Sequence, residues 1–188
     1  MAARASQAPT CTLVSGPSGS GKSRWAEHLA SRSDAEVVYL ATGPRRLEDL
    51  DWQVRLERHR RRRPPDWITV EVEGDLARSL CQLNPDQLGL VDSLGTWVAA
   101  HLEQDSPSWI ALRLELLSAL ATCPAELVLV GEEVAWGVVP PTALGCRFRD
   151  RLGELNRQVA QLCSAHWLVV QGRALDLKAL GLPVPEQE

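Results

Sequence analysis

A glycine-rich segment near the N-terminus is the part of the chain that most clearly predicts chemistry. Residues 16–23 read GPSGSGKS and match the pattern G-x-x-x-x-G-K-[ST] at every fixed position. Glycines let successive backbone N–H groups turn inward and hold phosphate oxygens, and a helix that follows adds the positive end of its dipole. The segment therefore predicts a site for a nucleoside triphosphate, ATP or GTP. The predicted binding residues are Gly16, Pro17, Ser18, Gly19, Ser20, Gly21, Lys22 and Ser23.

Two side chains of this segment have distinct predicted roles. Lys22 should reach the β- and γ-phosphates as a catalytic cation, and the Ser23 hydroxyl should bind Mg²⁺. A second magnesium ligand is normally an Asp at the end of an apolar strand, and Asp92 is the favoured candidate. Glu132 and Glu133 end another apolar run. They could orient a substrate or a water, or they could be solvated loop acids.

An arginine-rich segment around His59 permits three interpretations. Six arginines between positions 55 and 63 surround this histidine. The segment could be a solvated basic helix face, an RNA-binding patch, or a triphosphate-binding surface in which His59 is a nucleophile. Histidine is a competent nucleophile near neutral pH, and guanidinium groups would stabilise charge that builds on phosphorus. From these residues alone, the solvated helix face is the simplest interpretation.

The elements that must position these residues alternate between short apolar runs and helical stretches. This alternation predicts an α/β fold, P-loop NTPase-like, with a mostly parallel central sheet and helices on both faces. The expected strands are Thr12–Ser15, Val37–Ala41, Ile68–Val72, Leu88–Asp92, Glu126–Gly131 and Trp167–Gln171. The expected helices are 22–32, 47–62, 75–82, 94–103, 107–122 and 146–164. We expect Ser106 to cap the fifth helix, with Pro107 first in it, and 132–144 to be irregular.

Composition is that of an ordinary enzyme and disfavours several other classes. The 188 residues, 45% hydrophobic and 23% charged, suit one globular domain, expected over 10–188 after a flexible tail over 1–9. The net charge of −4 disfavours nucleic acid as a partner. No apolar run approaches the roughly 20 residues of a membrane span. Five cysteines without a CxxC pair favour a reducing, cytoplasmic location.

Several further segments are more specific than the glycine-rich loop. Val38–Thr42 reads like a YIAT strand end, and 55–67 reads like R-I-x-x-H…R-P-x-x-W. Leu90–Trp97 is similar to LVDCLTLW, 133–140 to EVGxGIVP, and 148–156 to FRDxxGxxN. In these segments the sequence resembles the bifunctional adenosylcobinamide kinase / adenosylcobinamide-phosphate guanylyltransferase family of cobalamin biosynthesis. The similarity extends from about Cys11 to Lys178.

The resemblance implies two reactions in one chain. The first phosphorylates the aminopropanol hydroxyl of adenosylcobinamide with a nucleoside triphosphate. The second transfers GMP from GTP, through a guanylylated histidine, to give adenosyl-GDP-cobinamide. His59 falls on the family's guanylylated histidine, and the family implies a homotrimer. The residues expected to complete the nucleotide site are Ala41, Thr42, Gly43, Arg60, Arg61, Arg62, Arg63, Glu71 and Asp92.

The sequence departs from the family's pattern near the expected acceptor. Glu132 stands where Asn is usual, Ala135 replaces a glycine, and Gly95 lies within the turn after Asp92. The first two changes fall where the corrinoid or its hydroxyl could bind. Trp97 and Trp136 could touch the corrinoid face.

Two other functions stay open at this point. The chain could be a P-loop small-molecule kinase that lacks the guanylyl step, with His59 structural. It could also be a non-catalytic nucleotide switch whose bound state is recognised by a partner. A covalent GMP adduct separates the bifunctional kinase and guanylyltransferase from both alternatives.

Overall fold

The computed structural model describes residues 10–43, 54, 57, 60–72, 74–137 and 139–185. The predicted tail over 1–9, His59 and most of the predicted helix over 47–62 lie outside the described residues. Within that predicted helix, the described residues 54, 57 and 60–62 are helical.

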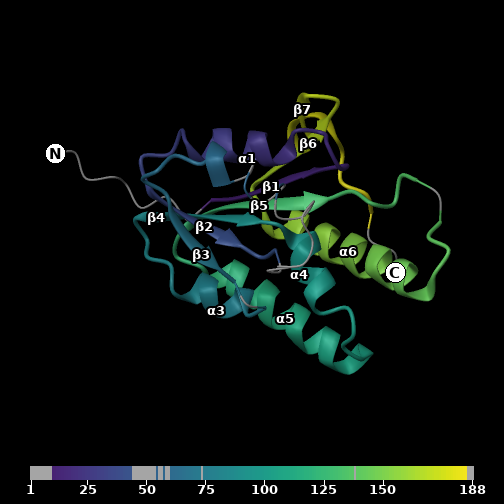
Figure 1. Ribbon diagram of the computed structural model, residues 1–188. Coiled ribbons are helices and arrows are strands. Elements are labelled where there is room, and N and C mark those ends of the chain that lie inside the picture. The colour runs from purple at the N-terminus through teal and green to yellow at the C-terminus, as the bar shows by residue number, and fades with distance from the viewer. Residues whose placement is uncertain are drawn as a thin grey trace.

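A seven-stranded sheet in the order β3-β2-β4-β5-β1-β6-β7 forms the centre of the molecule (Figure 1). Its strands are β1 Cys11–Gly16, β2 Glu36–Ala41, β3 Ile68–Glu71, β4 Gln87–Asp92, β5 Glu126–Glu132, β6 Ala165–Val170 and β7 Arg173–Asp176. Every neighbouring pair is parallel except β6 and β7. The predicted mostly parallel sheet is confirmed, because the apolar runs of the sequence form strands that are covered on both faces.

The strand β7 was not predicted, although a turn signal precedes it. Gln171 and Gly172 join β6 to β7 with φ angles of 48° and 75°. Positive φ at both positions is the geometry of the tight turn that joins antiparallel strands. A polar residue followed by glycine after an apolar run is a signal for such a hairpin, and Arg173–Asp176 is too short to be recognised by its own pattern.

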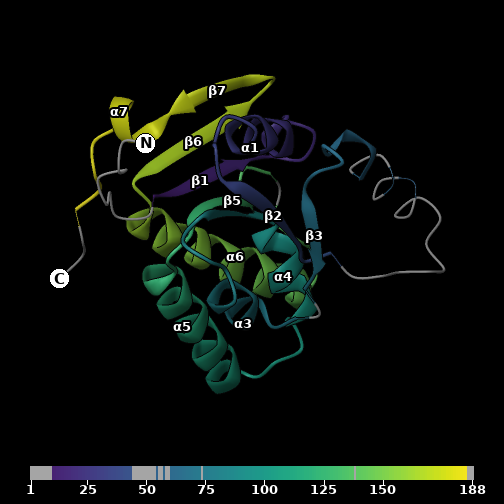
Figure 2. The same cartoon turned by 90° about the vertical axis from the view of Figure 1, so that its left-hand side faces the viewer.

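Helices cover both faces of the sheet (Figure 2). They are α1 Lys22–Ala30, α3 Leu76–Cys81, α4 Leu94–Ala100, α5 Ser106–Thr122, α6 Ala143–Leu162 and α7 Leu177–Leu180. On one face, Ala26 and Ala30 of α1 pack with Val14 and Leu90. The opposite face carries α3, α4, α5 and α6. The predicted two-sided covering of the sheet is therefore confirmed.

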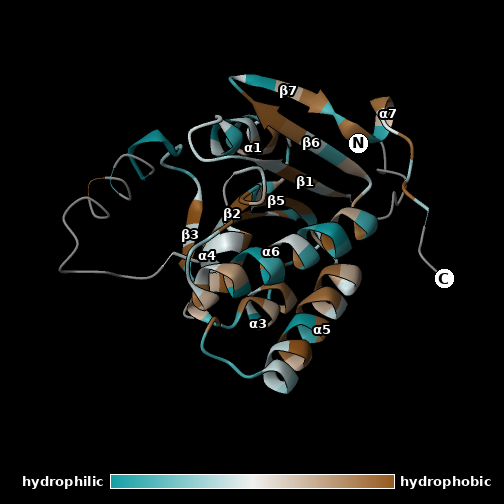
Figure 3. Ribbon diagram, turned by 90° about the vertical axis from the view of Figure 1, so that its right-hand side faces the viewer, coloured by the Kyte–Doolittle hydropathy of each residue, from teal (hydrophilic) through white to brown (hydrophobic). Residues whose placement is uncertain are grey.

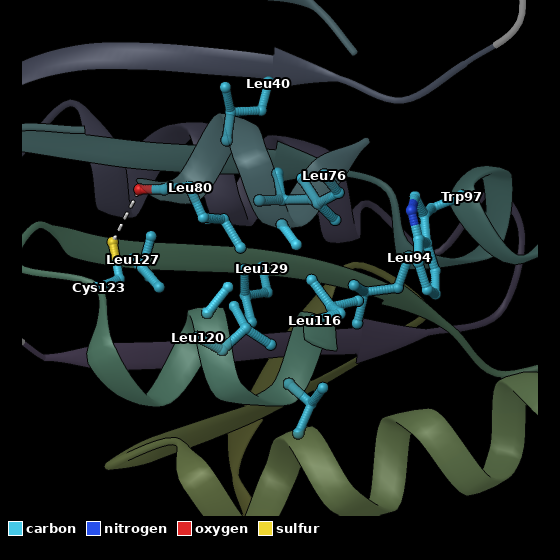
Figure 4. Close-up of a cluster of buried hydrophobic side chains, with 14 of the residues drawn as sticks. Leu40, Leu76, Leu80, Leu94, Trp97, Leu116, Leu120, Cys123, Leu127 and Leu129 are labelled. Carbon is cyan, nitrogen blue, oxygen red and sulfur yellow. Dashed lines mark hydrogen bonds between the residues drawn. The ribbon is translucent and has the colours of Figure 1, made fainter. Parts of the chain in front are cut away.

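The larger core lies between the sheet and α3, α5 and α6. Leu80, Leu116 and Leu129 of β5 belong to one cluster of buried residues there, and Figure 4 shows their side chains gathered together. Hydrophobic residues are frequent along the strands, while the helices alternate between hydrophilic and hydrophobic residues (Figure 3). Trp97 belongs to this core, because it is 2% exposed and its Nε1 donates to the carbonyl of Gly74. The expectation that Trp97 could touch a corrinoid is therefore wrong.

The starts of α5 and α6 differ from the prediction for reasons that their caps explain. Asp105, rather than Ser106, caps α5, and its carboxylate accepts a hydrogen bond of 2.9 Å from the backbone N–H of Ser108. Aspartate caps helices as well as serine does, so the helix gains one residue at its start. Thr142 caps α6 in the same way, and that helix begins at Ala143 instead of 146. Of the segment 132–144 that was predicted to be irregular, the described residues 133–137 and 139–142 form neither helix nor strand, whereas Glu132 belongs to β5 and residues 143 and 144 belong to α6.

In the described part of the chain, no helix has the length and apolar character needed to cross a bilayer.

Candidate nucleotide-binding site

The proposed site residues meet at one edge of the sheet because their strands run in parallel. The carboxyl ends of β1, β4 and β5 adjoin one another, and β5 lies between the other two. Gly16 of β1 is therefore in register with Glu132, and Asp92 of β4 is in register with Val130. Parallel sheets bind ligands in crevices at such strand ends. The fold thus brings Asp92 and Glu132 to the phosphate loop from more than 60 residues away.

The phosphate loop turns out of β1 and enters α1 at Lys22. Gly19 and Gly21 adopt backbone φ angles of 74° and 100°, which residues with a Cβ atom rarely adopt. Gly21 is the residue before the helix and offers no side-chain cap to its first amides. These N–H groups at the positive end of the helix suit an anionic ligand.

The side chain of Lys22 lies against the phosphate loop. The residue is only 7% exposed, and its Nζ lies 3.4 Å from the carbonyl oxygen of Pro17. Such a cation on the inner side of the loop can reach the β- and γ-phosphates without a large movement of the backbone. The position agrees with the role predicted for Lys22.

Ser23 and Asp92 face each other across the site. The Ser23 hydroxyl donates to Oδ1 of Asp92 at 3.5 Å, although 69 residues separate them in sequence. Hydroxyl and carboxylate oxygens are ligands that Mg²⁺ accepts. The pair therefore fits the predicted magnesium position, and Asp92 suits it better than Glu132, whose carboxylate is engaged elsewhere.

The Glu132 carboxylate points into the turn after Asp92. It accepts hydrogen bonds from the hydroxyl of Ser93 and, at 2.8 Å, from the backbone N–H of Gly95. A Cβ atom at position 95 would collide with this carboxylate, so Gly95 leaves the space that Glu132 fills. Burial raises the pKa of Glu132, while Ser93 and Lys22 act in the opposite direction. The alternative of a solvated loop acid is wrong for Glu132.

Glu133 is held differently from its neighbour. Burial raises the pKa of its carboxyl, and a hydrogen bond with the Ser15 side chain lowers it in part. The Ser15 hydroxyl also lies 2.9 Å from Nε2 of His166 on β6. The half-buried position of Glu133 likewise differs from that of a fully solvated acid.

The end of β2 supplies Ala41, Thr42 and Gly43 to the same edge. Thr42 is buried, and its hydroxyl donates to the carbonyl of Ser93 at 2.6 Å and accepts from the Ser93 N–H at 2.7 Å. The side chain of Thr42 thus holds the turn after Asp92.

The arginine run divides into an outward and an inward part. Arg61 is 80% exposed and pairs with Glu57 one turn away, as a solvated helix face would. Arg62 instead pairs with Glu27 of α1 at 3.0 Å, and the guanidinium of Arg63 lies 3.4 Å from the centre of the Tyr39 ring. The interpretation as a uniformly solvated basic face is therefore wrong for the last two arginines.

Glu71 joins this region from the end of β3. Its carboxylate pairs with Arg60 at 2.9 Å, and both residues help to line a pocket of about 400 Å³ beside Arg63 and Trp67. Glu71 is therefore a partly buried, paired residue at the end of its strand. The structure thus brings Arg60, Arg63 and Glu71 together.

Tyr39 is a site residue that sequence reasoning did not single out. It lies within an apolar strand and resembles a core residue, yet its hydroxyl donates to Oδ2 of Asp92 at 2.6 Å. Glu27 was missed as well, because its pairing with Arg62 spans 35 residues. The available signal was the phenol itself, since a buried tyrosine hydroxyl requires a hydrogen-bond partner.

The strand order, the loop and the Ser23–Asp92 pair define a nucleotide-binding α/β protein of the P-loop NTPase class. A solved structure of a prototypical ATPase from the type III secretion system of pathogenic bacteria superimposes with a TM-score of 0.52 at 12% identity, covering 93% of this chain and 59% of that one. That likeness supports the fold alone.

Sequence comparison places the chain within this class. The family model for CobU, cobinamide kinase / cobinamide phosphate guanyltransferase, matches residues 12–177. The bifunctional adenosylcobalamin biosynthesis protein CobU of Escherichia coli is 35% identical over 181 residues, covering 88% of this chain and 98% of that protein. The corresponding protein CobP of Pseudomonas aeruginosa is 36% identical over 168 residues, with coverage of 88% and 96%. The chain belongs to this family, as the resemblance predicted.

Proposed function

We propose that this protein phosphorylates adenosylcobinamide with ATP or GTP and then transfers GMP from GTP to the product, giving adenosyl-GDP-cobinamide. The observation that carries the proposal is the meeting of the phosphate loop with Asp92 in a chain of the cobinamide kinase / guanyltransferase family. The alternative of a nucleotide switch is disfavoured, because the family to which the chain belongs is one of kinases and guanyltransferases.

The first step is a phosphoryl transfer. The hydroxyl oxygen of the aminopropanol arm forms a bond to the γ-phosphorus, and the bond from that phosphorus to the β–γ bridging oxygen breaks. The hydroxyl proton passes to solvent, and the nucleoside diphosphate leaves. Such transfers depend mostly on positioning and on stabilisation of charge, which the loop amides and the buried Lys22 are placed to supply.

The second step uses His59 as the nucleophile, by resemblance to the family. A ring nitrogen bonds to the α-phosphorus of GTP, and pyrophosphate leaves as the α–β bridge breaks. A phosphate oxygen of the cobinamide phosphate then bonds to the same phosphorus, and the P–N bond breaks. Positive charge from Arg60–Arg63 would favour the neutral imidazole and stabilise the transition state.

Mg²⁺ is the proposed metal, with Ser23 and Asp92 as its protein ligands. When bound it would neutralise charge on the phosphate oxygens. The Ser23 hydroxyl and the Asp92 carboxylate face the position expected for it, and Tyr39 holds the far oxygen of that carboxylate.

A homotrimer in the cytoplasm is the proposed state of the protein. The trimer is taken from the resemblance to the family, and the location is supported by five cysteines that are all free thiols. Light scattering on the purified protein tests the trimer directly. A monomeric mass at working concentration would contradict it.

The test of the guanylyl step is the intact-protein mass after incubation with GTP and Mg²⁺. Wild type should gain the mass of one GMP, and His59→Ala should gain none. His28→Ala is the matched control, because His28 is an exposed histidine on α1 and should keep the adduct. An adduct that persists in His59→Ala would place the nucleophile elsewhere.

The kinase step is tested separately by transfer of ³²P from γ-labelled ATP or GTP to cobinamide. Transfer without any GMP adduct would leave a P-loop kinase with a structural His59. Nucleotide binding with neither reaction would favour the switch.

A further inference from the structure

A line of contacts joins the two parts of the proposed site through one buried side chain. Tyr39 is 2% exposed and sits in the centre of β2. At one end its hydroxyl donates to Oδ2 of Asp92 at 2.6 Å. On its ring face, the guanidinium carbon of Arg63 lies 3.4 Å from the ring centre. Tyr39 therefore contacts both the metal-side carboxylate and the arginine run.

We propose that Tyr39 is a positioning residue, whose hydroxyl orients Asp92 for Mg²⁺-nucleotide binding and whose ring holds Arg63 over the same site. The inference rests on the proposed function, and it adds to it a residue that connects the metal side to the arginine side. Tyr39 acts through Asp92 and Arg63, so it need not touch the nucleotide itself.

The hydroxyl can orient Asp92 because it engages only one of the two carboxylate oxygens. With Oδ2 held by the phenol, Oδ1 faces the Ser23 hydroxyl. Rotation of the carboxylate would break a short hydrogen bond to a charged acceptor, which is stronger than a neutral one.

The ring can hold Arg63 because the contact is close and a second contact supports it. A guanidinium over an aromatic face is attracted by the negative charge of that face. Arg62, the preceding residue, pairs with Glu27 of α1 at 3.0 Å. The run is therefore anchored at two points, to α1 directly after the phosphate loop and to β2 beside the strand that ends in Asp92. Arg63 also donates to Thr69 on β3, which limits its freedom further.

The test compares Tyr39→Phe with Tyr39→Leu by nucleotide binding, which does not require turnover. The dissociation constant of a non-hydrolysable GTP analogue is measured by calorimetry, with Mg²⁺ and with EDTA. Wild type should bind more tightly with Mg²⁺. In Tyr39→Phe this gain should shrink by about tenfold, as expected for the loss of a hydrogen bond to a charged group, while binding in EDTA stays within about twofold of wild type.

Tyr39→Leu removes the ring as well and should weaken binding in both conditions. Arg63 then loses the surface on which it stacks, so affinity in EDTA should also fall, by about three- to tenfold. Equal losses in the Phe and Leu variants would contradict the role assigned to the ring.

Ser33→Ala is the matched control for loss of a hydroxyl–carboxylate bond. Its hydroxyl lies 2.9 Å from Oε2 of Glu126, which begins β5 at the opposite edge of the sheet. This variant should keep the full Mg²⁺ gain. A change as large as that of Tyr39→Phe would mean that general loosening of the fold, rather than the orientation of Asp92, explains both.

A double-mutant cycle distinguishes a specific effect on Asp92 from a general loss of stability. On an Asp92→Asn background, Tyr39→Phe should change the Mg²⁺ gain by less than about twofold, because its target has already been altered. Additive losses, or a wild-type Mg²⁺ gain in Tyr39→Phe itself, would overturn the inference. Such a result leaves the proposed function standing when wild type still forms the GMP adduct. Wild-type protein that binds no nucleotide would overturn both.

Discussion

The phosphate-loop side and the arginine side of the candidate site hold their charges in different ways. Asp92 ends the buried strand β4, and Lys22, which is 7% exposed, begins α1 directly after the phosphate loop. On the arginine side the charges sit on long side chains, with Arg60 51% and Arg61 80% exposed. The first side is positioned by the backbone of the sheet. The second depends on side-chain partners such as Glu71 for Arg60 and Glu57 for Arg61, so single substitutions should affect the two sides unequally.

The largest effect should come from removal of the phosphate-loop cation. Lys22→Ala should reduce both phosphoryl transfer to cobinamide and GMP adduct formation by at least about 100-fold, because a preorganised cation in a buried site has no substitute. Initial rates of both reactions measure this. Lys178→Ala, which changes the other lysine of the chain, is the control and should be close to wild type. A loss in one reaction only would mean that the two steps do not share this site.

A smaller effect should separate the inward from the outward arginines. Arg63→Ala should slow GMP adduct formation by about 10- to 100-fold, because it loses both its charge and its contact with Tyr39. Arg61→Ala removes an exposed pair with Glu57 and should change the rate by less than about twofold. Quenched time courses followed by mass spectrometry give both rates. Equal losses would show that the run acts through total charge rather than through individual contacts.

The smallest effect concerns the buried carboxyl between the two strand ends. The folded-state pKa of Glu132 is raised, mainly by burial. Above the unfolded-state value of 4.5 the unfolded chain therefore releases this proton first, and stability falls as the pH rises toward the folded-state pKa. Urea unfolding across this range should show a steeper decline for wild type than for Glu132→Gln. Parallel pH profiles would mean that the carboxyl titrates normally. Comparison with Gln also cancels the contribution of Glu133, which is unchanged in both proteins.

Much of the architecture was predictable because its signals are local. The six predicted strands are found within two residues of their expected ends, since each is an apolar run that a two-sided parallel sheet requires. The strand Arg173–Asp176, which was not predicted, pairs antiparallel at the edge of the sheet. Its four residues are too few to show a recognisable alternation of apolar and polar residues. The cap of α5 moved from Ser106 to Asp105 because both residue types can cap a helix and only the backbone geometry decides between them.

The sequence by itself determined the phosphate loop and the place of Asp92 at the end of a strand, because a fixed spacing of glycines and an apolar run that ends in a carboxylate are local patterns. The tertiary structure alone decided which side chains surround them. It placed the Tyr39 hydroxyl on Asp92, turned Arg62 toward Glu27, and buried Trp97 in the core. The hydrogen bonds of Tyr39, Arg62 and Trp97 join residues that lie 53, 35 and 23 positions apart in the sequence. Their physical basis is the need of each buried polar group for a partner, and the order of the strands determines which partners are within reach.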